Sequence, residues 1–314
     1  MKEKTHISVV SPVYKAENII KELVRRLKEN LDKITDSYEI ILVNDSSPDN
    51  SWEAIEKECN NDDKIVGVNL SRNFGQQYAI TAGINISKGD WVVIMDCDLQ
   101  DKPEEIINLY KKALEGYDSV FAKRINRNDS LFKKLFSKIF YSVFSYLTDT
   151  KQDSSVANFG IFNRKVIEAV LSMKDYIRYL SAMIQWVGFK IYYLPVEHSE
   201  RYEGKTSYNI KGLFKLAFDT IIAFSYKPLR LIILFGFFIV LSSFIIGIYY
   251  FINYFLGNIP VMGFTTIILF LCFLSGIIIS VLGIIGLYVG KIFESVKNRP
   301  TYIIKDIVNT NNDI

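Results

Sequence analysis

The chain has 314 residues, enough for one α/β catalytic domain and a smaller appendage. Hydrophobic residues make up 49% and charged residues 23%, and the net charge of +3 is too small to indicate nucleic-acid binding. The three cysteines, Cys59, Cys97 and Cys272, are too far apart in the sequence for a zinc motif or a disulfide framework. This favours a reducing compartment, and the N-terminus shows no signal-peptide hydrophobic region. We therefore expect the polar part of the chain to lie in the cytoplasm.

Short apolar runs alternate with helix-period segments through the first half of the chain. We expect strands at residues 6–10, 39–43, 65–69 and 91–95, and helices at 18–31, 52–59, 75–85 and 104–116. Ser51 is placed to cap the second helix, and Pro103 stands near the start of the fourth. Strand–helix alternation predicts a Rossmann-like α/β domain whose mostly parallel sheet is covered by helices on both faces.

Polar clusters follow each of the four expected strands. In sheets of this kind, ligands bind at the carboxyl ends of the strands. The clusters stand there in the sequence, and they begin at Pro12, Asn44, Ser71 and Asp96. Four such coincidences indicate an enzyme.

Two carboxylates follow the fourth expected strand. Alternate residues of an extended strand point the same way, so Asp96 and Asp98 present their carboxylates together. Hard oxygen ligands at this spacing suit Mg²⁺ or Mn²⁺ bridging the oxygens of a diphosphate. A bare Asp-x-Asp pattern also fits a turn at a strand end, but Asp45 after an earlier strand strengthens the metal-site interpretation.

Three further residues near strand ends fit a nucleotide. Asp45 and Glu17 are placed to contact the base and ribose, and Tyr14 to line the base. Each of these residues, taken alone, fits a turn or a helix cap equally well.

Two segments combine aromatic, apolar and basic residues at helical spacing, at 131–147 and 210–225. The pattern fits an amphipathic helix lying on a membrane surface. For residues 131–147, a core helix that covers the sheet is the alternative.

Two stretches, 229–256 and 265–289, are long enough to span a bilayer as helices, and charged residues are almost absent between 231 and 289. The connecting loop, 257–264, has no basic residue, whereas basic residues flank the pair at Lys227, Arg230, Lys291, Lys297 and Arg299. The positive-inside bias therefore predicts that both termini are cytoplasmic. The alternative is a buried helical hairpin of a soluble protein.

The motifs occur in an order that resembles family 2 glycosyltransferases. The segments that carry the resemblance are Ser11-Pro-Val-Tyr, Val43-Asn-Asp-Ser-Ser-Pro-Asp, Ser71-Arg-Asn-Phe-Gly-Gln-Gln and Met95-Asp-Cys-Asp-Leu-Gln-Asp. The likeness continues through Arg201-Tyr-Glu-Gly-Lys-Thr-Ser-Tyr, Phe224-Ser-Tyr-Lys-Pro-Leu-Arg and Lys297-Asn-Arg-Pro-Thr-Tyr. More narrowly, these segments resemble the polyprenyl-phosphate branch, which includes dolichyl-phosphate mannose synthase and bactoprenol glucosyltransferases.

The resemblance implies a GT-A fold, inversion at the anomeric carbon and a set of site residues. The implied metal and diphosphate site is Asp96, Asp98 and Gln100. Arg124 and Arg201 resemble a basic clamp on the diphosphate and the acceptor phosphate, which suits the bidentate geometry of arginine. Together with Gln100, the implied nucleotide-sugar contacts are Pro12, Tyr14, Glu17, Asp45, Arg72 and Gln76.

The sequence departs from the family pattern at two places. Ser207 stands where the family usually has a lysine, and Lys205 is two residues earlier. Asn158 lies in a segment where many bacterial relatives have an acidic residue, and it cannot act as a general base. A phosphate monoester has a second pKa of about 6, so a lipid phosphate is already nucleophilic at neutral pH. We therefore expect activity to persist, and Asn158 is free to bind the sugar.

We expect four regions: a GT-A domain at 1–210, a juxtamembrane amphipathic helix at 211–228, two transmembrane helices at 229–290 and a cytoplasmic tail at 291–314. Gly276, Ser280 and Gly283 allow close packing of the helices, and such small residues also suggest an oligomer.

The predicted reaction is the transfer of one sugar from a nucleotide diphosphate, with a UDP-sugar favoured, to a polyprenyl phosphate of the undecaprenyl type at the cytoplasmic membrane. A processive polysaccharide synthase and a non-catalytic nucleotide-sugar sensor or scaffold are the alternatives. The first is disfavoured because Gln185-Trp186 lacks the arginine of the synthase motif and only two spans follow. The second is disfavoured by the intact Asp96 and Asp98.

Overall fold

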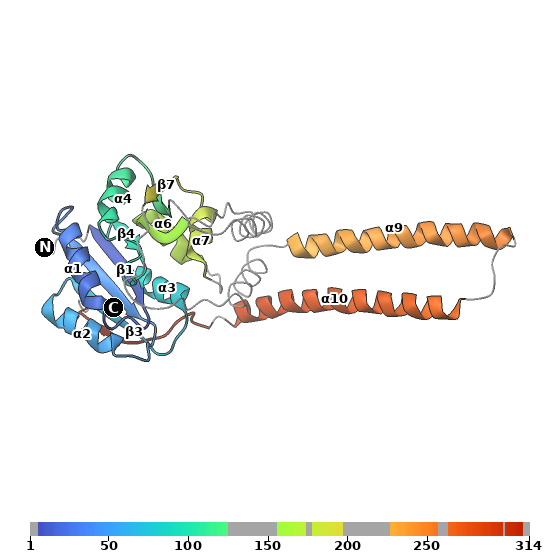
Figure 1. The fold of residues 1–314 in the computed structure, drawn as a ribbon, viewed down its shortest axis with the longest axis horizontal. Coiled ribbons are helices and arrows are strands. Elements are labelled where there is room, and N and C mark those ends of the chain that lie inside the picture. The colour runs from blue at the N-terminus through green and yellow to red at the C-terminus, as the bar shows by residue number, and fades with distance from the viewer. Residues whose placement is uncertain are drawn as a thin grey trace. The chain divides into compact units, whose positions relative to one another are not determined.

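The computed structural model describes residues 6–124, 156–173, 178–196, 227–256, 263–297 and 299–309. The chain divides into two compact units, one that contains the sheet and one that contains two long helices (Figure 1). The predicted amphipathic segments at 131–147 and 210–225 lie outside the described residues.

The described residues of the first unit form one eight-stranded sheet in the order β7-β5-β6-β4-β1-β2-β3-β8. The strands are β1 (Ile7–Val13), β2 (Tyr38–Asn44), β3 (Ile65–Leu70), β4 (Trp91–Ile94), β5 (Ser119–Arg124), β6 (Val156–Asn163), β7 (Ile191–Val196) and β8 (Ile304–Val308). β1 runs parallel to β2 and β4, β2 to β3, and β5 to β7. β6 is antiparallel to β4 and β5, and β8 is antiparallel to β3. The prediction of a mostly parallel sheet is confirmed.

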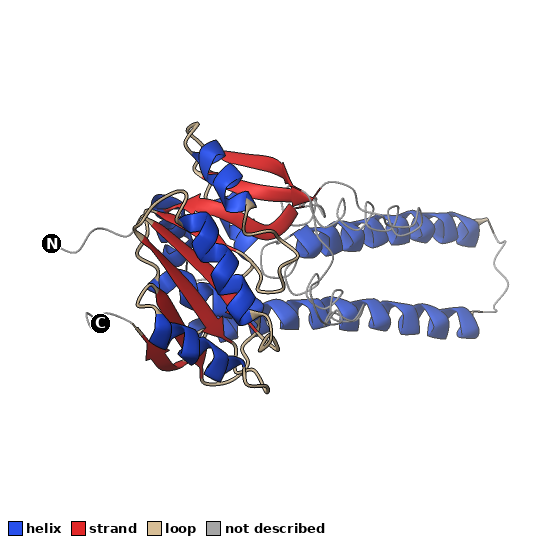
Figure 2. Cartoon of the chain, turned by 60° about the vertical axis from the view of Figure 1, so that its left-hand side comes forward, coloured by secondary structure: helices blue, strands red, loops and turns tan. Residues whose placement is uncertain are grey.

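Helices cover both faces of this sheet (Figure 2). They are α1 (Ile20–Leu31), α2 (Ser51–Asn61), α3 (Gln76–Ile86), α4 (Glu105–Ala113), α6 (Arg164–Ser172) and α7 (Leu180–Trp186). β1 is buried along its whole length, so alternate residues contact opposite layers. Val9 belongs to the core that contains Leu23 of α1, whereas Val10 lies against α3 on the other face. A Cβ at Gly83 of α3 would stand only 2.3 Å from Val10, so glycine permits this close approach.

The expected helices form within a few residues of their predicted bounds, but the role expected of Ser51 is wrong. Ser51 is the first residue of α2, and Asn50 occupies the cap position without a side-chain hydrogen bond to the helix. The buried Ser51 hydroxyl instead accepts from the Ala16 amide at 3.1 Å and donates to Asp49 at 2.6 Å. It therefore joins the loop after β1 to the loop after β2.

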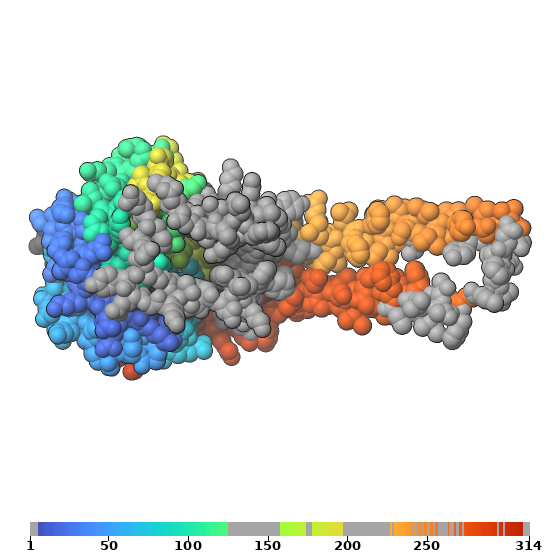
Figure 3. Space-filling model, viewed as in Figure 1, coloured from blue at the N-terminus to red at the C-terminus, as the bar shows by residue number. Residues whose placement is uncertain are grey.

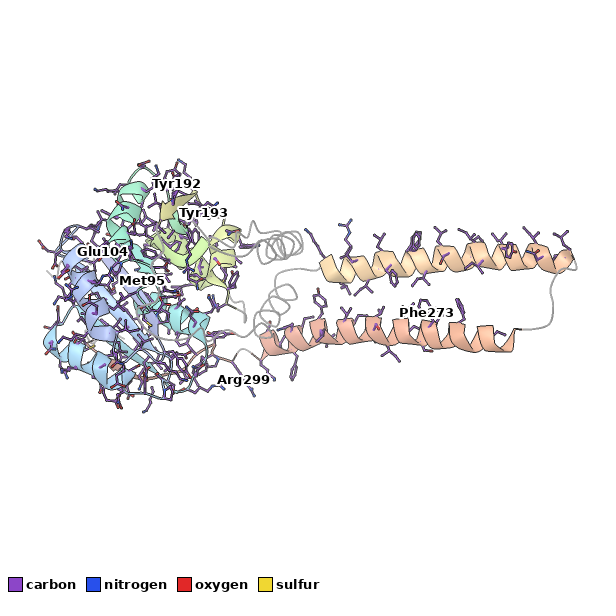
Figure 4. The ribbon with its side chains drawn as sticks, in the orientation of Figure 1. Met95, Glu104, Tyr192, Tyr193, Phe273 and Arg299 are labelled. Carbon is purple, nitrogen blue, oxygen red and sulfur yellow. The ribbon has the colours of Figure 1, made fainter. Side chains whose placement is uncertain are left out.

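The second unit contains two long apolar helices, α9 (Lys227–Phe255) and α10 (Phe264–Val296), which run side by side in opposite directions (Figure 1). Each is long and apolar enough to cross a membrane, and the two candidate spans are not buried inside the protein. Their apolar side chains stand at the surface in the space-filling view (Figure 3). Phe273 lies on the side of α10 that faces α9, where it helps to line an apolar groove (Figure 4). Such surfaces are stable in hydrocarbon and costly in water.

The described part of 291–314 does not form the separate tail that was predicted, and its cytoplasmic location remains a prediction. α10 continues to Val296, and residues 304–308 form β8, the edge strand beside β3. The chain therefore returns to the sheet after its second apolar helix. Local patterns do not show this pairing, because the two strands are separated by more than two hundred residues.

Candidate active site

The carboxyl edge of the sheet gathers those predicted site residues that the structure describes. The parallel pairing of β1 with β2 and β4 brings the loops after Val13, Asn44 and Ile94 to this edge. β5 ends at the same edge with Arg124, and the antiparallel β6 begins there, because Lys123 pairs with Val156.

Gln76 links the first turn of α3 to the predicted metal site. Its Nε2 atom donates a hydrogen bond of 2.6 Å to Oδ1 of Asp96, which is partly exposed at the end of β4. Burial raises the pKa of Asp96 to about 7, and the charges of Asp101 and Asp98 act in the same direction. The Arg124 charge and the hydrogen bond from Gln76 oppose the rise. A cation placed beside Asp96 would relieve this repulsion.

Asp101 adds a third carboxylate that sequence reasoning did not select. Its side chain is 2% exposed, and its Oδ1 lies 3.4 Å from Nη2 of Arg124. Leu99, two residues earlier, has φ of 58°, a left-handed conformation that is uncommon for a residue with a side chain. This tight turn brings Asp101 back toward Asp96 and Asp98. The signal available in the sequence was a third acidic residue five positions after Asp96.

These residues fit a divalent cation that also contacts a diphosphate. Among the described residues, no three His, Cys, Asp or Glu side chains form a group that encloses a metal by themselves. Mg²⁺ is commonly held by one or two carboxylates together with substrate phosphates, and its remaining ligands are waters. Asp96 and Asp98 supply hard oxygen donors of that type. The side chain predicted as a third ligand, Gln100, remains a prediction, although its backbone amide donates to Asp98 at 3.1 Å.

Asp45 holds the loop that leads into α3. Its two carboxylate oxygens accept hydrogen bonds from the backbone amides of Phe74 at 2.7 Å and Gly75 at 2.8 Å. Burial raises the pKa of Asp45, and these two hydrogen bonds counteract the rise. Gly75 has φ of 101°, which favours glycine, and Gln76 follows it directly. Asp45 thereby positions the residue that binds Asp96, a role that sequence reasoning missed.

Residues 8–171, more than half of the chain, match the model of the family described as Glycosyl transferase family 2. The chain is a family 2 glycosyltransferase.

Curated relatives align with this family 2 glycosyltransferase over nearly its whole length. It is 36% identical over 309 residues to the uncharacterized glycosyltransferase YkcC of Bacillus subtilis, covering 97% of this chain and 95% of the relative. It is 32% identical to the undecaprenyl-phosphate 4-deoxy-4-formamido-L-arabinose transferase of Photorhabdus laumondii, covering 97% and 95%. It is also 32% identical to the SfII prophage-derived bactoprenol glucosyl transferase of Shigella flexneri, covering 95% and 97%.

The fold of the glycosyltransferase is GT-A. A mannosyltransferase of Pyrobaculum calidifontis, solved with GDP-mannose and Mn²⁺, matches 73% of this chain and 65% of its own with a TM-score of 0.50. The sequence identity between the two is 17%, so this likeness concerns the fold alone. It confirms the predicted fold class.

Three residues predicted to contact the nucleotide lie at or near the same carboxyl edge of the sheet. Tyr14 is 42% exposed after β1, and Pro12 is buried within that strand beside Val43. Glu17 accepts a hydrogen bond from the side chain of Asn50 at 3.1 Å. These contacts order the rim of the site, and direct contact with a nucleotide remains a prediction for all three predicted residues.

Three other predicted site residues come from separate segments of the chain. Arg72 is exposed after β3, and its guanidinium carbon lies 4.6 Å from the centroid of the Phe74 ring. Asn158 is partly exposed near the start of β6. Ile94 of β4 pairs with Gly160 of β6, and continuing this antiparallel register by two residues leads to Asp96 on one chain segment and Asn158 on the other. Arg201 lies outside the described residues, as does Ser207.

Proposed function

We propose that this family 2 glycosyltransferase moves one sugar from a nucleotide diphosphate, with a UDP-sugar favoured, to a polyprenyl phosphate of the undecaprenyl type. The reaction takes place at the cytoplasmic face of the membrane, and the product carries the sugar into cell-envelope glycan modification. The main support for this proposal is the alignment with relatives named for bactoprenol and undecaprenyl phosphate, which extends over at least 95% of this chain. It therefore includes the long apolar helices as well as the sugar-transfer domain.

The membrane helices support a lipid acceptor. A lipid phosphate stays at the bilayer surface, so an enzyme that uses it gains from being held there. α9 and α10 provide two candidate spans. Basic residues stand near the start of α9, at Lys227 and Arg230, and near the end of α10, at Lys291 and Lys297. The positive-inside bias places these ends, and the sheet domain with both termini, in the cytoplasm.

The acidic and basic groups of the site suit a single displacement. An oxygen of the acceptor phosphate attacks C1 of the sugar from the face opposite the leaving group. A C1–O bond to the acceptor forms, the C1–O bond to the donor diphosphate breaks, and the nucleoside diphosphate departs with the electron pair. Attack from the opposite face inverts the configuration at C1.

The chain's residues have distinct parts in this reaction. Asp96 and Asp98 would hold Mg²⁺ or Mn²⁺, which stabilises the negative charge of a departing diphosphate when bound. Gln76 keeps the Asp96 carboxylate in place, and Asp45 keeps Gln76 in place. Arg124 forms an ion pair with Asp101 at the same edge of the sheet. Its planar guanidinium group is suited to binding phosphate oxygens.

The reaction needs no general base at Asn158. A phosphate monoester with a second pKa of about 6 is largely a dianion at neutral pH, so no proton has to be removed during attack. Correct placement of the two substrates then supplies much of the rate increase. The amide of Asn158 is suited to hydrogen bonds with sugar hydroxyl groups, which favours a role in donor selection.

The test uses the purified full chain in detergent with undecaprenyl phosphate, Mg²⁺ or Mn²⁺, and a panel of UDP- and GDP-sugars. Nucleotide release and the glycolipid product are both measured, the latter by mass spectrometry. A metal-dependent polyprenyl-phosphate sugar from one donor supports the proposal and identifies the sugar. Nucleotide binding without transfer from any donor favours a sensor, and products with several sugars favour a processive synthase.

A further inference from the structure

A row of three polar side chains runs across β2, β3 and β8, and it begins at the last residue of β2, next to the predicted nucleotide contact Asp45. Asn44 of β2 pairs in register with Asn69 of β3, and Asn69 pairs with Asp306 of β8. Residues paired in register point to the same face of a sheet. Asn44 is 3% exposed and Asn69 is 7% exposed, while the Asp306 side chain remains about half exposed at the sheet edge.

Hydrogen bonds run along this row in one direction. Asn69 donates from Nδ2 to Oδ2 of Asp306 at 3.2 Å, and Asn44 donates from Nδ2 to Oδ1 of Asn69 at 2.9 Å. An ionised aspartate can only accept, so it determines which end of the Asn69 amide faces it. The Asn69 oxygen then faces Asn44 and determines the orientation of that amide as well.

The far end of the row holds the loops at the site. Oδ1 of Asn44 accepts from the backbone amide of Ser47 at 3.2 Å. The Ser47 hydroxyl accepts from the Lys15 amide at 2.7 Å. Ser46 and Lys15 have φ of 50° and 54°, so both loops contain a backbone conformation that needs support from its surroundings. Tyr14 and Asp45 stand next to these two residues.

We propose that Asp306, in the strand that follows the membrane helices, is a positioning residue for the nucleotide donor. It orients the amides of Asn69 and Asn44 so that an oxygen faces the Ser47 amide. This inference rests on the proposed function, because it concerns the loops expected to bind the donor nucleotide. If the row were reversed, Nδ2 of Asn44 would face the Ser47 amide, and two donors would oppose each other.

The backbone of the same segment adds a second connection to the site. The Ser71 amide donates to the Ile303 carbonyl at 2.9 Å, and Arg72 follows Ser71. Tyr302 is hydrogen-bonded to the side chain of Asn85 in α3. The segment leading into β8 therefore contacts the loop after β3 and the helix that carries Gln76, in addition to the loops reached through the row.

The chain offers a matched control at the other end of β8. Nδ2 of Asn309 donates to the Ile65 carbonyl at 3.1 Å and also to the Cys59 and Asp62 carbonyls. Asn309→Ala weakens the attachment of β8 without altering the row. Asp306→Asn keeps the shape of the side chain but lets the row reverse, and Asp306→Ala removes the acceptor.

The experiment measures the dissociation constants of UDP and GDP with Mn²⁺ for the full chain in detergent, together with thermal melting and the donor KM and kcat. For the nucleotide that the unaltered chain binds, we expect Asp306→Asn and Asp306→Ala to raise the dissociation constant and KM about three- to tenfold, the scale of one hydrogen bond. We expect kcat to fall by a smaller factor than KM rises, since the row contacts the loops predicted to bind the nucleotide and reaches Asp96 only indirectly, through Asp45 and Gln76. Asn309→Ala lowers the melting temperature with less than about a twofold change in affinity.

A double-mutant cycle separates positioning from general stability. In an Asn44→Ala background the row no longer reaches Ser47, so Asp306→Ala has no further effect on nucleotide affinity. Equal affinity losses in Asp306→Asn and Asn309→Ala, or additive losses in the cycle, would overturn the inference. If Asn44→Ala does not fold, the comparison of Asp306→Asn with Asn309→Ala decides the matter. Absence of UDP and GDP binding by the unaltered chain would overturn the proposed function, and the donor role of Asp306 with it.

Discussion

The side chain of Gln76 donates a 2.6 Å hydrogen bond to the carboxylate of Asp96, and this contact joins the first turn of α3 to the end of β4. Gly75, the residue before Gln76, is held by Asp45 at the end of β2. The loops after β2, β3 and β4 are therefore linked by hydrogen bonds at the carboxyl edge of the sheet. A disturbance in one loop is expected to reach the others.

Replacing Gln76 tests this contact directly. Gln76→Ala removes a hydrogen bond to an ionised group, and we expect kcat/KM to fall about tenfold or more with a higher requirement for Mn²⁺. Gln77→Ala is the matched control, because Gln77 accepts from the Leu180 amide at 3.1 Å instead. Initial rates over a series of Mn²⁺ concentrations measure both effects. Equal losses in the two variants would contradict the role given to Gln76.

The raised pKa of Asp96 predicts that metal binding depends on pH near neutrality. Burial and the neighbouring carboxylates place this pKa at about 7. Below that pH the proton competes with the cation, so Mn²⁺ affinity falls, approaching about tenfold per pH unit. Above it Asp96 is already ionised and the dependence levels off. Mn²⁺ titrations followed by electron paramagnetic resonance between pH 5.5 and 8.5 measure this, and a flat profile would contradict the prediction.

The sequence predicted the acidic centre because its signal is local. Asp96 and Asp98 directly follow an apolar run, and alternation in an extended segment places their carboxylates together. The parallel order of strands then explains why Asp45, from a separate strand, reaches the same edge. Fold class and the centre of the site follow from such patterns.

Other parts of the site depend on contacts that local patterns do not contain. Asp306 and Asn69 are 237 residues apart, and residues 304–308 were expected in a tail rather than in the sheet. Asp101 belongs to the acidic centre only because a left-handed turn at Leu99 brings it back. Ser51 has the composition of a helix cap, yet tertiary hydrogen bonds to Ala16 and Asp49 determine its role.

Removing the Asp45 carboxylate is expected to lower stability as well as binding. Asp45→Ala leaves the amides of Phe74 and Gly75 without their acceptors, which costs about 1–3 kcal/mol of the free energy of unfolding for each buried group that water does not reach. Asp45→Asn keeps one oxygen acceptor and should lose less. Thermal and urea unfolding of the full chain in detergent, together with nucleotide affinity, check this order. Loss of nucleotide affinity with unchanged stability in both variants would show that Asp45 acts on the nucleotide instead.

Removing the Asp98 carboxylate should separate catalysis from membrane insertion. Asp98 is partly exposed in the loop between β4 and α4, so its loss leaves no large cavity in the core. If it holds the cation that stabilises the departing diphosphate, Asp98→Ala lowers the transfer rate about 100-fold or more. α9 and α10 belong to the other compact unit of the chain, so the variant should still insert into membranes. Asp36→Ala, at a loop far in sequence from the acidic centre, provides a control for the loss of one carboxylate. Carbonate extraction of membranes and glycolipid formation by mass spectrometry measure the two properties, and normal turnover by Asp98→Ala would refute the metal-site assignment.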